Sequence, residues 1–319
     1  MEYGEWRIMI FMRKIYLFAL LLFLITCKEE TNKMKSEKEL LQQADSLFHS
    51  GKLEDATKEY KEILKQGAKN KRILYRLASS YSLLQKEETA FYYLKSATEL
   101  DSSLYYISDP YYYNLLGTQT WDNLLDDLIS RNTDVDLSDT KSSLIKELIN
   151  LGIKDQAFYY EIDNFPNKGF YETKKDSLTR ENIKELEDII QKNGWPKLSE
   201  VGEICSRSAF LVLQHSDLDM QLKYANLLAE LDSKDEIDKS NYALFLDRIR
   251  FRQSQKQLFG SQINYDAEKD KYFIDLNTIE NPNKINQRRK EYGLEPIEDY
   301  LKRYNIEWDV SKQRNYSTK

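Results

Sequence analysis

A set of residues repeats at an interval of 34 positions, and this repeat constrains the fold more than any other feature of the chain. Small residues recur as the pairs Ala44 with Ala78 and Ala56 with Ala90. The other matched pairs are Leu47 with Tyr81, Tyr60 with Leu94, and Ile63 with Ala97. Small side chains let two helices approach closely, and larger ones fill the groove between them. The repeat therefore predicts two successive helical hairpins over residues 37–104.

The spacing and residue types of this segment resemble the tetratricopeptide repeat. The resemblance implies a concave face that binds a peptide or protein, although two repeats can also serve only to hold the next domain at a distance. Since about three such units are needed for a stable stack, we expect a cap. The apolar segment Asp109–Ser130, which does not keep the interval, is the predicted cap. The predicted first domain is residues 37–130.

The N-terminus carries the pattern of an export signal. A positive pair, Arg13 and Lys14, precedes the apolar run Ile15 to Ile25, which is too short to span a membrane and is typical of a secretory signal peptide that begins at Met12 rather than Met1. The run ends in Leu-Ile-Thr-Cys, which resembles the lipobox of bacterial lipoproteins. This resemblance implies removal of residues 1–26 and lipidation of Cys27. An ordinary cleaved signal or a short anchor remains an alternative.

A lipidated Cys27 would anchor the protein to a membrane, because two or more acyl chains hold a protein stably where one does not. Residues 27–36 would then form a polar tether. We expect the protein in the cell envelope, at the outer membrane of a Gram-negative bacterium. The sequence Lys-Glu-Glu at residues 28–30 resembles a signal for surface display, but it is short, and either leaflet remains open.

Composition excludes several classes of function. The net charge is −6, and it becomes −7 when residues 1–26, which carry +1, are removed. An acidic chain with no basic run is a poor nucleic-acid binder. The two cysteines are Cys27 and Cys205, so a lipidated chain has no partner for a disulfide and no cysteine-based metal motif. We expect neither a metal nor a cofactor.

The polar segment 130–139 is the predicted boundary between two domains. Its acidic residues suggest a calcium loop, but Asp139 stands where that loop needs glycine, and Ile145 stands where it needs glutamate. A second domain is predicted over residues 139–302, followed by a polar tail over residues 303–319.

Apolar periodicity predicts the elements of the second domain. The expected helices cover residues 140–162, 179–193, 200–231 and 239–252. A β-hairpin is expected over residues 259–276, with its turn near Ala267–Asp270, and a last helix carries Arg288 and Arg289. The predicted fold class is mainly α: helical-hairpin repeats, then a mostly helical C-terminal domain with a small β-hairpin.

His215 is one of only two histidines in the chain. On the expected helix 200–231 it shares a face with apolar residues one turn away on either side, Leu211 and Leu218, so it would lie within a buried stripe. A lone histidine on such a stripe is more often structural than functional. If a carboxylate such as Asp247 were its partner, however, it would be a general base. We favour a structural role and leave the functional one open.

The second domain resembles an uncharacterised bacterial domain family over about residues 139–302. The residues that carry the resemblance are Gly194-Trp195-Pro196, Gly202, Gln214-His215, Asp217, Gln221, Asp247-Arg248, Gln257, Gly260-Ser261-Gln262, Arg288-Arg289, Gly293-Leu294 and Tyr300. Two positions depart from the family pattern. Phe259-Gly260-Ser261-Gln262 replaces Tyr-Gly-Thr-Gln, and Tyr159 replaces an arginine expected after Asp155-Gln156. The resemblance implies a domain but no activity.

Polar residues of this signature are the candidate site. The candidate catalytic residues are His215, Asp247 and Arg248, and the candidate ligand-binding residues are Gln214, Gln262, Arg288 and Arg289. Together they would suit an anionic or amide-bearing ligand. Three functions remain open: a binding or scaffolding module, a hydrolase or transferase with His215 as general base, and an inhibitor or immunity-type partner. We favour binding, because no nucleophile motif or phosphate loop accompanies His215. The oligomeric state stays open.

Overall fold

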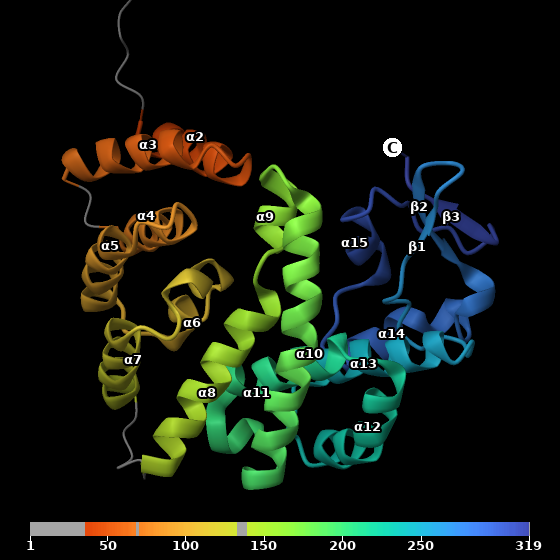
Figure 1. Cartoon of the computed structure of the whole chain (residues 1–319). Coiled ribbons are helices and arrows are strands. Elements are labelled where there is room, and N and C mark those ends of the chain that lie inside the picture. The colour runs from red at the N-terminus through yellow and green to blue at the C-terminus, as the bar shows by residue number, and fades with distance from the viewer. Residues whose placement is uncertain (1–35, 68–69, 133–138, 319) are drawn as a thin grey trace, which may run out of the picture.

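The computed structural model of the chain describes residues 36–67, 70–132 and 139–318 (Figure 1). The predicted signal peptide, the lipobox with Cys27, most of the tether and most of the predicted boundary segment lie outside these residues. Within the described part of the chain, no helix combines the length and apolar character needed to cross a membrane.

Two helical hairpins stand where the repeat predicts them. The first pairs α2 (Glu37–His49) with α3 (Leu53–Lys65), and the second pairs α4 (Lys71–Leu83) with α5 (Glu87–Leu100). The small residues of the repeat, Ala44, Ala56, Ala78 and Ala90, are all fully buried. Ser36 and Glu39 form a capping box at the start of α2, which satisfies backbone N–H groups of its first turn.

The predicted cap follows as α6 (Leu104–Ile107), the 3-10 helix η1 (Pro110–Leu115) and α7 (Gln119–Asn132). Tyr112 of η1 and Trp121 of α7 are fully buried. The Tyr112 hydroxyl lies 3.3 Å from the Ser79 hydroxyl of α4, so η1 is fixed against the second hairpin.

The second region, residues 139–318, contains more helices than the sequence predicts. They are α8 (Asp139–Gln156), α9 (Tyr159–Asn164), α10 (Lys168–Asn193), α11 (Leu198–His215), α12 (Leu218–Ser233) and α13 (Lys239–Arg252). The prediction for residues 239–252 is confirmed. The single helix predicted over 140–162 is wrong, because Phe158 adopts a positive φ of 71° and separates α8 from α9. Helix α10 begins before the predicted 179–193.

The helix predicted over residues 200–231 is also two helices. Asp217 adopts an extended conformation, and its carboxylate accepts a hydrogen bond from the backbone N–H of Met220 at 2.8 Å. This is the geometry of a helix N-cap, so a new helix starts there. Helix α11 therefore ends at His215, and the predicted stripe that places Leu211, His215 and Leu218 on one helix does not exist.

A small antiparallel sheet lies near the C-terminus, in the order β1 (Asn264–Asp266), β2 (Lys271–Asp275) and β3 (Arg314–Tyr316). The predicted hairpin is β1–β2, and the mainly α fold with a small sheet is confirmed. The segment predicted as a polar tail supplies β3, whose Asn315 lies opposite Ile274. Pairing with β2 satisfies backbone groups that a free tail would leave to water. The elements between β2 and β3 are η2 (Leu276–Thr278), η3 (Pro282–Lys284), α14 (Ile285–Glu291) and α15 (Ile297–Lys302).

One hydrophobic core extends from the helical hairpins into the helices of the second region, and a separate cluster that includes Ile274 and Ile297 packs beside the sheet. In Figure 1 the hairpins lie on one side of the long helices α8 and α10, and the sheet lies on the other. Tyr160 of α9 packs against Phe48 of α2, with ring centroids 5.3 Å apart, and its hydroxyl donates a hydrogen bond to the Phe48 carbonyl. The turn residue Gly51 is so close to Asn164 that an added Cβ would lie 3.0 Å from the Asn164 Cβ. The first hairpin is therefore held directly against α9.

Candidate functional site

His215 is the last residue of α11 and pairs with a carboxylate. Its Nδ1 atom lies 2.8 Å from Oδ2 of Asp155, which is near the end of α8. The Asp155 side chain is 1% exposed and that of His215 is 22% exposed. The prediction that His215 lies within a buried stripe is therefore wrong, since the buried face of α11 runs through Phe210 and Leu213 instead.

The His215–Asp155 pair has the geometry of an acid–base group. The Gln156 side chain donates a hydrogen bond to the same Asp155 oxygen at 2.6 Å, which holds the carboxylate in place. A carboxylate bound to Nδ1–H leaves the lone pair of a neutral imidazole on Nε2. No residue in the described part of the chain makes a hydrogen bond to this Nε2 atom. It is therefore free to accept or donate a proton.

Two arginines of α13 bind backbone carbonyls at the C-terminal end of α11, beside His215. Arg248 donates from Nη1 to the Gln214 carbonyl at 3.2 Å, and Arg252 donates to the Ser216 carbonyl at 2.7 Å. Positive charge is favourable at this end of a helix. Burial lowers the pKa of the Arg248 guanidinium. Two buried atoms, Arg248 Nε and Gln214 Oε1, make no hydrogen bond within the described residues. One hydrogen-bond donor and one acceptor are therefore unpaired next to His215.

Asp247 lies elsewhere and is not the partner of His215. It is fully buried, and its carboxylate accepts backbone hydrogen bonds from Leu258 at 2.6 Å, Phe259 at 3.0 Å and Ser261 at 2.9 Å. Burial raises the pKa of the Asp247 carboxyl, and these donors oppose the shift. The expected His215–Asp247 pair is therefore replaced by His215–Asp155, and Asp247 holds a loop.

Other members of the signature hold the same loop, residues 257–262. Arg288 Nε donates to the Leu258 carbonyl at 2.7 Å, and Arg289 Nη1 donates to the Phe259 carbonyl at 2.6 Å. We call the group around this loop the loop cradle; its members are Asp247, Gln257, Gln262, Arg288, Arg289 and Tyr300. Of the sequence candidates, the structure thus brings Gln214, His215 and Arg248 together, and it places Asp247, Gln262, Arg288 and Arg289 in the loop cradle.

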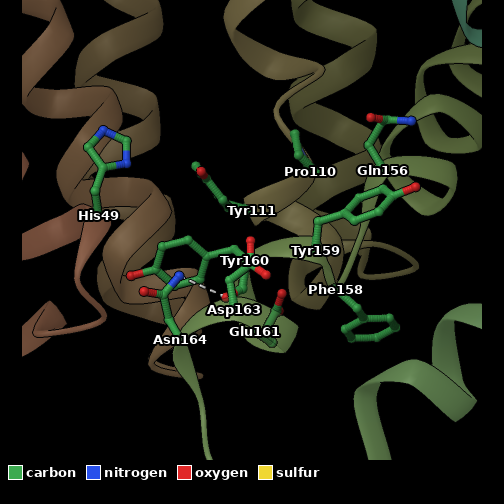
Figure 2. Close-up of a pocket in the computed structure, with 10 residues that line it drawn as sticks. All are labelled: His49, Pro110, Tyr111, Gln156, Phe158, Tyr159, Tyr160, Glu161, Asp163 and Asn164. Atoms are coloured by element: carbon green, nitrogen blue, oxygen red, sulfur yellow. Dashed lines mark hydrogen bonds between the residues drawn. The ribbon is translucent and has the colours of Figure 1, made fainter. Parts of the chain in front are cut away.

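A cavity of about 390 Å³, called the hollow here, opens where the first region meets α8 and α9 (Figure 2). Its lining residues are His49, Pro110, Tyr111, Gln156, Phe158, Tyr159, Tyr160, Glu161, Asp163 and Asn164. Five of these ten residues follow the break at Phe158, so the residue that ends α8 early also builds this wall. Gln156 belongs both to the hollow and to the Asp155 hydrogen-bond network, which connects the hollow to His215.

Charge in the hollow is mainly negative. Glu161 is 7% exposed, and burial raises the pKa of its carboxyl. Burial and the nearby Arg76 lower the pKa of His49, so its imidazole is neutral at pH 7. Sequence reasoning missed this site because it placed residues 159–162 inside a continuous helix over 140–162. The available signal was the aromatic and acidic run Tyr-Tyr-Glu-Ile-Asp at residues 159–163, two residues after Asp155-Gln156.

A neighbouring cavity of about 510 Å³ shares Pro110 and Gln156 with the hollow and reaches Cys205. Burial raises the pKa of the Cys205 thiol to about 12, so this cysteine is not an activated nucleophile. Within residues 36–67, 70–132 and 139–318, no cluster of three His, Cys, Asp or Glu side chains is placed to hold a metal ion.

Comparison with known families gives a match to the second region. The model of a family of unknown function, DUF6624, matches residues 141–310, which is more than half of the chain and includes the His215–Asp155 pair and the loop cradle. No curated protein and no solved structure matches the chain. The predicted resemblance to an uncharacterised domain family is confirmed: the chain belongs to the DUF6624 family of unknown function.

Proposed function

We propose that this protein is a lipid-anchored binding module of the bacterial cell envelope, in which the helical hairpins and the DUF6624 domain hold a peptide ligand between them. The observation that carries the proposal is the hollow, because its wall comes from α2 and η1 on one side and from α8 and α9 on the other. Ligand sites commonly form where two structural units meet.

Sequence resemblance supports the rest of the proposal. The repeat of residues 37–104 resembles the tetratricopeptide repeat, a peptide-binding scaffold, and the lipobox-like run ending at Cys27 supports an anchor in the outer membrane of a Gram-negative bacterium. A membrane anchor would keep the hollow beside envelope peptides and raise their effective concentration.

The anchor is tested with the full chain produced in a Gram-negative host. The wild type should sediment with membranes, and Cys27→Ser should move to the soluble fraction while keeping the same helical circular dichroism. Replacement of Cys205 by serine is the matched control and should leave the protein with the membranes. A Cys27→Ser protein that still sediments with membranes would contradict the anchor.

Ligand binding is tested on an array of synthetic peptides probed with the detergent-solubilised full chain. Asp163 lines the hollow and is exposed, so Asp163→Trp should fill the space without disturbing the core. We expect this variant to lose binding that the wild type shows. The control Asp176→Trp, at an exposed position of α10, should keep it. Equal binding by wild type and Asp163→Trp would place the ligand outside the hollow.

A second function, a hydrolase or transferase acting on an anionic or amide-bearing envelope substrate, is favoured by the 2.8 Å contact of His215 with Asp155. His215 would accept through Nε2 the proton of an attacking water or hydroxyl. The test compares products released from envelope extracts by the wild type and by His215→Gln, detected by mass spectrometry. Products made by the wild type alone would support catalysis; identical product sets would exclude it.

A further inference from the structure

We propose that the hollow binds an alkylammonium group, as carried by a lysine side chain of a peptide. This inference rests on the proposed binding function and specifies which ligand chemistry the hollow selects. It follows from one buried carboxylate, from the aromatic rings around it, and from the charge of the lining.

Glu161 is the buried carboxylate. Its residue is 7% exposed, yet it lines the hollow, and Figure 2 shows its side chain among the lining groups. Within the described residues, no side chain donates a hydrogen bond to this carboxylate. The backbone N–H of Glu161 itself is the hydrogen-bond donor that lowers the pKa of this carboxyl, and burial outweighs it. A carboxylate that has lost much of its hydration and has no side-chain donor is unfavourable in its charged form. A ligand that brings N–H donors and positive charge would remove this penalty.

The nearby cations do not fill that role. Lys174 lowers the pKa of Glu161 from a distance, but its ammonium lies over the rings of Phe158 and Phe170, 5.5 and 4.8 Å from their centroids. Arg76 lies over the Phe48 ring at 4.7 Å. Neither residue belongs to the lining of the hollow.

Aromatic rings form much of the wall. Tyr111 and Tyr160 are 5.3 Å apart in an edge-to-face arrangement, and the hydroxyl of Tyr160 is fixed by the Phe48 carbonyl. Tyr159 stands farther along the wall in Figure 2, but the Lys175 ammonium already lies 3.9 Å from its ring centroid. The rings available to a ligand are therefore those of Tyr111 and Tyr160. The face of such a ring attracts a cation within about 6 Å of its centroid. Fixed rings around a carboxylate are therefore suited to an organic cation.

The charge of the lining also selects a cation. The residues around the hollow include Glu161 and Asp163 but neither lysine nor arginine, and His49 is neutral at pH 7. An anion would be repelled, and a neutral group would bring no positive charge to the Glu161 carboxylate. A volume of about 390 Å³ is within the range of small-ligand sites, and it accommodates an extended alkylammonium chain.

The test uses the pentapeptide acetyl-Ala-Ala-Lys-Ala-Ala-amide and the same peptide with norleucine in place of lysine. Norleucine keeps a linear aliphatic chain and removes the charge. Titrations of the full chain are followed by NMR or calorimetry up to about 10 mM peptide. We expect the lysine peptide to bind about tenfold more tightly, a difference of about 1.4 kcal/mol.

Glu161→Gln should abolish this preference while leaving the melting temperature unchanged or raised. The control Glu172→Gln, at an exposed position of α10, should keep the preference. Equal affinity for the two peptides, a preference that survives in Glu161→Gln, or no saturable binding of the lysine peptide would overturn the inference.

Failure of the inference is distinguishable from failure of the proposed function. If array peptides bind the wild type and lose binding in Asp163→Trp, but show no dependence on lysine, the hollow is a binding site for a different chemistry and only the inference fails. If no array peptide depends on the hollow, the proposed function fails as well.

Discussion

Asp247 and Asp155 are two buried carboxylates of the DUF6624 domain with different surroundings. Asp247 receives three backbone N–H groups from one loop and is fully buried. Asp155 is held by two side chains, and one of them, His215, keeps a free nitrogen and a partly exposed ring. The difference indicates that Asp247 maintains structure, whereas Asp155 orients a group that remains available.

The largest expected effect is that of Asp247→Asn. An asparagine offers one acceptor oxygen to three N–H donors and places its own N–H₂ group against them. We expect a loss of about 3 kcal/mol in the free energy of unfolding, measured by chemical denaturation. Asp155→Asn, which keeps an acceptor for the His215 Nδ1–H, should lose about 1 kcal/mol. Equal losses in the two variants would remove the distinction between the two carboxylates.

A third carboxylate, Asp109, extends the comparison of Asp247 with Asp155, because it accepts a hydrogen bond from only one backbone N–H group among the described residues. Its oxygen accepts the N–H of Tyr111 at 3.0 Å, and burial raises its pKa to about 6. The folded protein therefore binds a proton more tightly than the unfolded chain, so this carboxylate reduces stability as the pH rises from about 4 to 6.

Asp109→Asn keeps the cap and removes the ionisation. Relative to the wild type, the variant should have equal stability at pH 4 and about 2 kcal/mol more at pH 7. The measurement is a series of urea denaturation curves between these pH values. A difference that is constant with pH would mean that the Asp109 carboxyl titrates normally.

The smallest effect on stability is expected for His215→Gln. The histidine is partly exposed, and a glutamine amide can still donate to Asp155, so the loss should be about 1 kcal/mol or less. Thermal denaturation measures it. A loss as large as that of Asp247→Asn would mean that His215 is a core residue, and its role as an acid–base group would no longer be supported.

The sequence predicted the elements correctly where a residue pattern repeats regularly along the chain. The 34-residue interval located both hairpins, and alternation located β1 and β2, because each pattern reflects contacts between neighbouring elements. The prediction failed at two helix breaks. Phe158 ends α8 with a positive φ, and Asp217 starts a new helix as an N-cap, although the apolar pattern continues through both positions. Those two breaks decide the site: the first builds the wall of the hollow, and the second leaves His215 at a helix end.

The pairing of His215 could not be read from the chain. The sequence alone allows either Asp155 or Asp247 to be the partner of His215. The packing of α8 against α11 brings Asp155 to the histidine. The loop cradle was hidden for the same reason, since Arg288 and Arg289 bind backbone carbonyls, which carry no sequence signal.

A peptide ligand that occupies the hollow should protect the backbone of the elements that line it. Hydrogen–deuterium exchange of the full chain, with and without saturating acetyl-Ala-Ala-Lys-Ala-Ala-amide, tests this expectation most directly. We expect slower exchange in α9 and η1 on addition of the peptide and no change in the loop held by Asp247. Unchanged exchange in α9 and η1, or protection confined to the loop, would contradict binding in the hollow.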